Sequence, residues 1–455
     1  LSMVNKMMEE HMPIDKTSLN QMYQLVQDNK DINVTTLVEL KRLGIEINQV
    51  NAAQFENYAN DKQAITIAMD SLIDELPNAL SAEDLSMYKL VTQARDILNI
   101  VTEGLPEEAF ISSEASDMSQ YEAIMRDNKS APVVKKHFNI AELFESLNSV
   151  SGESQDIHTT QKINNAPATD TILLQENETK SNTIGFLLSD KQIEELNEQV
   201  RMLLPDLQEN NISLYSEDSS VVGILNDIKS MLENTPANAD TLRHLFSGEA
   251  FKLMLKEALE QQWMIKPGDL EKNPKKLDGL YDKIEKQITN MEIILKTSGV
   301  VNPKAEALAD NIRGNIEFMN QLNQAYTYVQ VPLKMSGQNA NGELYVYTNK
   351  KNLRDPDAEL SAFLHLDLEH LGSTDVSVKM QHRNVKTNFY MADDASYDLV
   401  EKYLPILEQK LKDKGYQCTI TMTKEEKKVS FGDDFLRKDM PQTGTLHRYS
   451  FDVRA

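Results

Sequence analysis

Apolar residues recur with helical spacing through most of the first 325 positions. The clearest run alternates intervals of four and three and consists of Leu277, Tyr281, Ile284, Ile288, Met291 and Leu295. This spacing predicts one apolar stripe along a helix. Gly299 and Pro303 interrupt it, and a second stripe over 308–322 predicts an antiparallel partner helix. A coiled-coil oligomer is the alternative but would need more heptads than this run supplies, so we favour an intramolecular helical bundle over residues 186–325.

The first 105 residues show the same pattern and predict an N-terminal helical domain. Gly44 is placed to end one of its helices, because glycine accepts the left-handed conformation there. Two further amphipathic segments, Phe55–Leu76 and Leu85–Val101, are separated by Pro77.

The helical pattern weakens over residues 106–185, which lie between the two helical regions. Residues 149–170 are rich in Ser, Thr, Asn and Gln and carry few large apolar side chains. Such a segment cannot offset the entropy lost on ordering, which predicts a flexible linker. Ser189 then predicts the N-cap of the next helix.

After Tyr326 the apolar period shortens from about 3.6 to about two residues, which predicts strands. The predicted strands cover 326–333, 344–347, 364–368, 376–380, 385–391, the residues around Cys418, and 449–453. Asn341–Gly342 predicts the turn between the first two. A helix is predicted over 395–414, capped by Asp393–Asp394, kinked at Pro405 and closed by Gly415.

The predicted fold class is α+β. The N-terminal two-thirds is mainly α-helical, in bundles, and the C-terminal domain has a mostly antiparallel sheet with a packed helix. The predicted domains are 1–105, a weakly structured 106–185, a bundle over 186–325 and an α+β domain over 326–455.

Charge divides the chain near the same boundary. The net charge is -24, while residues 326–455 hold 18 Lys and Arg against 19 Asp and Glu, so nearly all of the excess lies before residue 326. An acidic protein is a poor ligand for phosphate backbones, so we expect no nucleic-acid partner. No stretch approaches the roughly 20 apolar residues that span a bilayer, so we expect no membrane insertion.

Candidate chemistry is sparse. The single cysteine, Cys418, cannot form an intramolecular disulfide, and its place in an alternating run favours a small core residue. Residues His365–His370 place several polar side chains on one face of a strand, but neighbours two apart lie about 6.6–7 Å apart and rarely share a metal ion. The sequence therefore predicts no catalytic residue, metal site or cofactor. A hydrolase or metal-dependent enzyme is the least favoured reading.

The run LHLDLEHLGSTDVSVKM, residues 364–380, resembles the signature of the C-terminal domain of flagellar hook-length control proteins. The matching positions are Leu364, Leu366, Leu371, Gly372, Val376 and Val378, with Leu407, Leu411 and Gly415 in the following helix. The family often has proline where this chain has Leu368. The primary role of these residues is structural, because the alternating leucines pack the strand against the core and the glycine permits a turn conformation. The N-terminal segments MVNKMMEEHMPID, LVELKRLGIEIN and FKLMLKEALEQQWMIKPGDL are similar to Clostridia-type relatives of the family.

The resemblance implies a switch of export specificity. In that family the C-terminal domain contacts the cytoplasmic domain of the type III export gate, and hook or hook-cap subunits are further candidate partners. The implied location is the cytoplasm, with export through the flagellar apparatus. Family members act without catalysis, by protein contact.

Outward side chains on the 364–372 strand and turn are the predicted contact surface. The candidates are Phe363, His365, Asp367, Glu369 and His370. An exposed Phe363 beside charges would suit an interface anchor, although burial of this ring under other residues is the alternative. The competing hypothesis for the whole chain is a non-catalytic scaffold whose helical bundles carry partner binding.

Overall fold

The computed structural model describes residues 2–105, 183–204, 213–234, 238–277, 279–299, 302–325, 327–335, 338–346, 359–368, 372–391 and 393–424. The first helices are α1 (Ser2–Glu9), α2 (Lys16–Asp28), α3 (Val34–Leu43), α4 (Gln49–Ala59), α5 (Ile65–Leu80) and α6 (Met87–Thr102). The next are α10 (Ile184–Leu187), α11 (Asp190–Leu203), α12 (Val221–Asn234), α13 (Ala239–Ser247), α14 (Glu249–Trp263), α15 (Pro267–Lys272), the 3-10 turn η2 (Pro274–Leu277), α16 (Leu280–Ser298) and α17 (Pro303–Ala325). None of the described helices is long and apolar enough to cross a membrane.

The C-terminal part forms one six-stranded sheet with strands in sequence order. The strands are β1 (Thr327–Met335), β2 (Gln338–Val346), β3 (Leu360–Leu368), β4 (Gly372–Gln381), β5 (Asn384–Met391) and β6 (Gln417–Thr423). Neighbours pair antiparallel except β5 and β6, which are parallel because α18 (Asp394–Asp413) crosses between them. The α+β class and the mostly antiparallel sheet are confirmed. The predicted strand at 449–453 and the linker at 149–170 lie outside the described residues.

Several local signals gave correct boundaries. Gly44 adopts φ +71° after α3 and accepts the chain reversal that ends the helix. Ser189 and Gln192 form a capping box at the start of α11. The Asp393 side chain accepts a 2.7 Å hydrogen bond from the Ser396 backbone N–H, and Gly415 adopts φ +85° just past α18.

Two boundary predictions were wrong. Pro77 lies within α5, and the segment predicted from Phe55 to Leu76 is two helices, α4 and α5. Asn341 and Gly342 lie inside β2, paired with Pro332 and Val331 of β1, so the chain does not turn there. Gly342 suits this place because a Cβ would lie 3.2 Å from Leu366 Cδ2 and 3.3 Å from the Val331 carbonyl oxygen.

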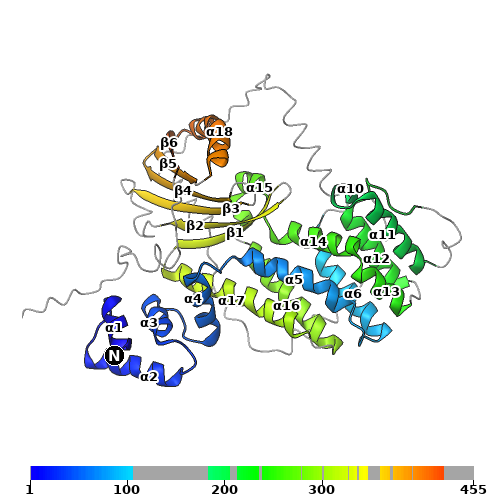
Figure 1. Ribbon diagram of the computed structural model, residues 1–455, viewed down its shortest axis with the longest axis horizontal. Helices are drawn as coiled ribbons and strands as arrows, with labels where there is room; N and C mark the ends of the chain where they lie inside the picture. The colour runs from blue at the N-terminus through cyan, green and yellow to red at the C-terminus, as the bar shows by residue number, and fades with distance from the viewer. Residues whose placement is uncertain are drawn as a thin grey trace, which may run out of the picture.

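The helices gather at the β1 side of the sheet, while α18 lies by β5 and β6 at the opposite end (Figure 1). Helices from both ends of the helical part interleave, since α5 and α4 pack on α17, and α6 packs on α12 and α16. One contiguous hydrophobic core runs from α1 to β3. The apolar stripe from Leu277 to Leu295 is buried in it. The domain division remains a prediction, and the helices on either side of 106–182 share this core.

Buried polar side chains join the sheet to the helices. Tyr58 of α4 donates a 2.7 Å hydrogen bond to Asn315 Oδ1 of α17, and Gln330 Nε2 of β1 donates to the Tyr58 hydroxyl at 2.8 Å. The Gln330 amide oxygen accepts from the Ile65 backbone N–H at 2.8 Å. Buried amides stabilise an arrangement only when they are bonded in this way, so the network fixes how β1 sits on α4 and α17.

Candidate functional site

The predicted contact strand is β3, and its polar side chains share one face as expected from the two-residue period. Phe363 pairs with Tyr345 of β2, and His365 pairs with Glu343 of β2 and Asp375 of β4. Glu369, His370 and Leu371 lie outside the described residues. The partner-contact role of these residues remains a prediction.

Phe363 is not a surface anchor. Its side chain is 1% exposed, and its ring centroid lies 6.2 Å from that of Tyr345. Tyr345 lies 5.0 Å from Tyr328, which lies 5.7 Å from Tyr58 of α4. Phe363 therefore ends a row of aromatic rings that seats the sheet on the helices, and the expectation of an exposed ring was wrong.

His365 is held between two carboxylates. Its Nδ1 lies 2.6 Å from Asp375 Oδ1, and its Nε2 lies 3.2 Å from Asp367 Oδ1. Burial alone would lower the pKa of His365, but the hydrogen bonds to both aspartates and their charges outweigh it and raise the pKa to about 10. A histidine that stays protonated at neutral pH is not poised to act as a general base.

Glu343 extends the polar row towards the helices. It is 3% exposed and accepts hydrogen bonds from Gln63 Nε2 at 2.8 Å, from Asn341 Nδ2 at 3.3 Å, and from the Tyr345 hydroxyl. Burial raises the pKa of the Glu343 carboxyl above its ordinary value. In register, the row reads Gln330, Glu343, His365, Asp375 and Tyr390 across β1 to β5.

This row is a structural ion cluster. Its charged groups are bonded to one another and to amides of the helical part, and each sits where burial without a partner would be costly. Among the residues that the structure describes, no three His, Cys, Asp or Glu side chains gather as metal ligands would. Asp367, with 57% of its side chain exposed, reaches solvent more fully than Phe363 and His365, the other described members of the predicted contact set.

The motif residues Leu364, Leu366, Val376 and Val378 lie on the opposite face of the sheet. Leu364 pairs with Val376, and Ala362 pairs with Val378, so their side chains form one apolar layer. Leu366 packs against the edge of the main core. Gly372 has φ +65°, a conformation that a Cβ would oppose, which accounts for glycine at the start of β4.

Residues 348–428 match the family model described as flagellar hook-length control protein FliK. The resemblance identified from the motif is therefore confirmed in the C-terminal region. This matched region contains β3, β4, β5, α18 and β6, and it leaves out β1, β2 and the helical part. No curated protein and no solved structure matches the chain.

Helix α18 of the matched region carries two apolar stripes. One holds Val400, Leu404, Leu407 and Leu411, all half-buried, and includes both motif leucines of this helix. The other holds Leu399, Tyr403 and Ile406, which are 46%, 53% and 55% exposed. The helix continues through Pro405. Among the described residues of 327–424, these three are the large apolar side chains that are exposed, and we call them the α18 stripe.

The sequence prediction did not single out the α18 stripe. A signal for it was present in the sequence, because the two stripes are offset by about 100° around the helix, the turn per residue. A helix that packs on a sheet buries only the side that faces the sheet. An apolar arc wider than that face leaves one edge for solvent or for a partner.

Proposed function

We propose that the protein controls flagellar hook length by switching the class of subunit that the type III export apparatus accepts. The observation that carries the proposal is the match of residues 348–428 to the hook-length control family. The action is non-catalytic and consists of protein contact with the cytoplasmic domain of the export gate. The protein works in the cytoplasm, and passage of its helical part through the apparatus belongs to the same proposal.

The contact surface that we propose is the α18 stripe. Asp367, whose side chain points to the other face of the sheet, is proposed as a separate charged contact together with Glu369 and His370, which follow it in the sequence. Exposed aliphatic and tyrosine side chains on a rigid helix are the anchors that interfaces use, with charged residues at the rim. Phe363 is not included in the proposed contact surface, because its side chain is buried. The burial of Phe363 fixes the sheet to the helices near β1, whereas α18 lies by β5 and β6 at the other end of the sheet.

Replacing the stripe by Leu399→Gln, Tyr403→Gln and Ile406→Gln together is expected to give overlong hooks without filaments. Glutamine keeps helix propensity close to that of leucine, and the three side chains are exposed, so the fold should be retained. Hook length is measured by electron microscopy. Binding of the full-length variant to the purified export-gate cytoplasmic domain should fall by at least about tenfold.

The matched control is Ile67→Gln with Tyr88→Gln, two side chains that are 66% and 80% exposed on α5 and α6. We expect normal hooks from it. If the stripe variant also gave normal hooks and filaments at native protein levels, the stripe would be excluded as the contact surface.

Removal of residues 326–455 tests the function itself. The switch proposal predicts overlong hooks without filaments. The scaffold alternative, in which the helical bundles bind the partner, predicts normal hooks. Because Tyr328 and Tyr345 are buried against the helices, the amount of truncated protein in the cell must be measured alongside. Normal hooks with the truncated protein present would contradict the switch.

A further inference from the structure

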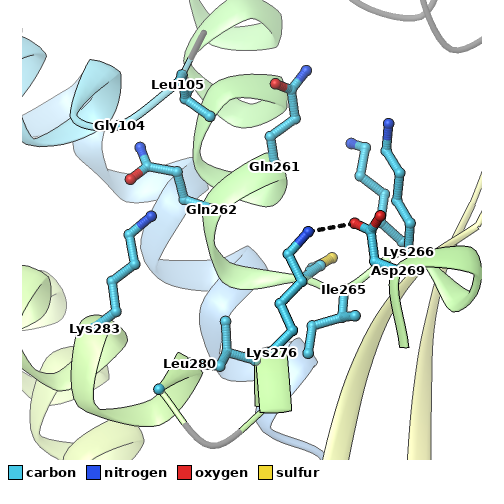
Figure 2. A pocket seen from close by; sticks show the side chains of 13 residues that line it. Gly104, Leu105, Gln261, Gln262, Ile265, Lys266, Asp269, Lys276, Leu280 and Lys283 are labelled. Atoms are coloured by element: carbon cyan, nitrogen blue, oxygen red, sulfur yellow. Dashed lines mark hydrogen bonds and ion pairs between the residues drawn. The ribbon is translucent and has the colours of Figure 1, made fainter. Parts of the chain in front are cut away.

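A cavity of about 420 Å³ lies among helices outside the matched region (Figure 2). Its walls come from Gly104 and Leu105, just after α6, from Gln261 and Gln262 near the end of α14, and from the start of α16. The α14–α15 link closes one side, where the Ile265 backbone N–H donates to the Pro332 carbonyl oxygen of β1 at 2.9 Å. The cavity therefore lies where the helices meet the first strand.

The lining is cationic. Four lysines and one aspartate line the cavity: Lys266, Lys276, Lys283, Lys334 and Asp269. In Figure 2 the side chain of Lys283 extends from α16 towards Gln262, and the Lys276 amine is joined to Asp269. A concentration of lysines is unexpected in a protein with a net charge of -24.

Two of the lysines are neutralised by neighbours. Lys276 Nζ lies 2.6 Å from Asp269 Oδ2. Lys334 Nζ lies 2.7 Å from Glu257 Oε2 and 2.8 Å from Glu260 Oε2.

Lys266 and Lys283 have no carboxylate within ion-pair distance in the described part of the chain. Lys283 is half-buried, and burial lowers its pKa, with repulsion from Lys276 in the same direction and the charge of Glu103 opposing it. A half-buried cation costs folding free energy unless an anion offsets it.

We propose that this cavity binds a small, multiply charged oxyanion, either a phosphate-bearing compound or a polycarboxylate, through Lys283 and Lys266 with Lys276 beside them. The volume falls within the range of small-molecule sites. Ammonium groups supply point charges that suit both kinds of anion. The lysines reach it from the α14–α15 link, from η2 and from α16, so the ligand would tie these elements together.

The test uses the full-length protein and two probes, pyrophosphate and citrate, each at ionic strength matched with sodium chloride. Binding raises the unfolding midpoint with the logarithm of ligand concentration. Lys283→Met should weaken binding by about tenfold or more, because a hydrogen bond to a charged group is lost, and should leave the ligand-free protein at least as stable. Lys266→Met is the second variant.

The matched control is Lys286→Met, which removes the same charge from an exposed position on the same helix. Shifts from pyrophosphate alone support a phosphate-bearing ligand, and shifts from citrate alone support a polycarboxylate. Shifts from both support a general oxyanion site. Equal shifts in Lys283→Met and Lys286→Met, or no shift with either probe, would overturn the proposal.

Discussion

Replacing Trp263 with alanine is expected to destabilise the folded protein by about 4 kcal/mol, within the range for large aromatic side chains deleted from cores. Trp263 ends α14 and is fully buried. Its indole N–H donates to Gln287 Oε1 of α16 at 2.8 Å, and Gln287 Nε2 donates to Gln262 Oε1 at 2.7 Å. Deletion leaves a cavity next to the α14–α16 contact and a buried amide oxygen without its donor.

The measurement is urea unfolding followed by circular dichroism, since Trp263 is the only tryptophan and its fluorescence is lost with it. Trp263→Phe keeps most of the ring volume but removes the N–H, so we expect a smaller loss of about 1–3 kcal/mol. Tyr88→Ala, at a side chain that is 80% exposed, should stay within about 0.5 kcal/mol of the parent protein. A Trp263→Ala loss no larger than the Tyr88→Ala loss would contradict the packing described here.

Helix positions and fold class could be predicted from the sequence because they depend on local signals. The stripe from Leu277 to Leu295 has the spacing of one helix face, and the capping residues Gly44, Ser189 and Asp393 act within one turn of their own position. The two-residue period after Tyr326 likewise reports alternating burial along each strand.

The errors concern contacts between distant segments. Asn341–Gly342 has the composition of a turn, but both residues pair with β1 and are therefore part of a strand. Glycine is needed at position 342 because a Cβ there would crowd the side chain of Leu366. The charged residues next to Phe363 in the sequence suggested that its ring is exposed to solvent, but Tyr345 and the helical part cover the ring. Neither contact can be deduced from spacing, because the first depends on the register between β1 and β2 and the second on how the sheet packs against the helices.

The candidate site divides in the same way. Motif spacing led to the family resemblance that the match at residues 348–428 confirms. The sequence shows two apolar stripes on α18, but it does not show which of them the sheet covers, so the exposed stripe could be identified only in the structure. The partner of His365 required the register that places Asp375 of β4 beside it, ten residues along the chain.

Asp375→Asn is expected to destabilise the protein by about 2 kcal/mol at neutral pH, because the half-buried, protonated His365 loses its closest counter-ion. Asp375 is 4% exposed, so water replaces the lost carboxylate poorly. Asp367→Asn removes a partner whose side chain is 57% exposed, and we expect a loss below about 1 kcal/mol from it.

The effect depends on pH with a definite sign. The folded-state pKa of His365, about 10, lies above its ordinary value of 6.5, so its contribution to stability is complete below about pH 6.5 and is lost as pH rises through about 10. Asp375→Asn lowers the folded-state pKa towards the ordinary value. The free energy of unfolding should therefore fall less steeply with pH in the variant, and the two curves should converge near pH 10.

Glu343 must be separated from this effect because its raised pKa also makes stability fall with rising pH. The loss of stability caused by Glu343 begins as pH rises above the ordinary pKa of its carboxyl, 4.5, whereas the loss caused by His365 begins above 6.5. Urea midpoints are therefore measured from neutral pH to pH 10 in the parent, in Asp375→Asn, and in both combined with Glu343→Gln. If the curves of parent and Asp375→Asn stayed parallel over this range in the Glu343→Gln background, His365 would not be the group that senses pH. Convergence in that background would establish that the His365–Asp375 pair couples protonation to the joining of β3 and β4.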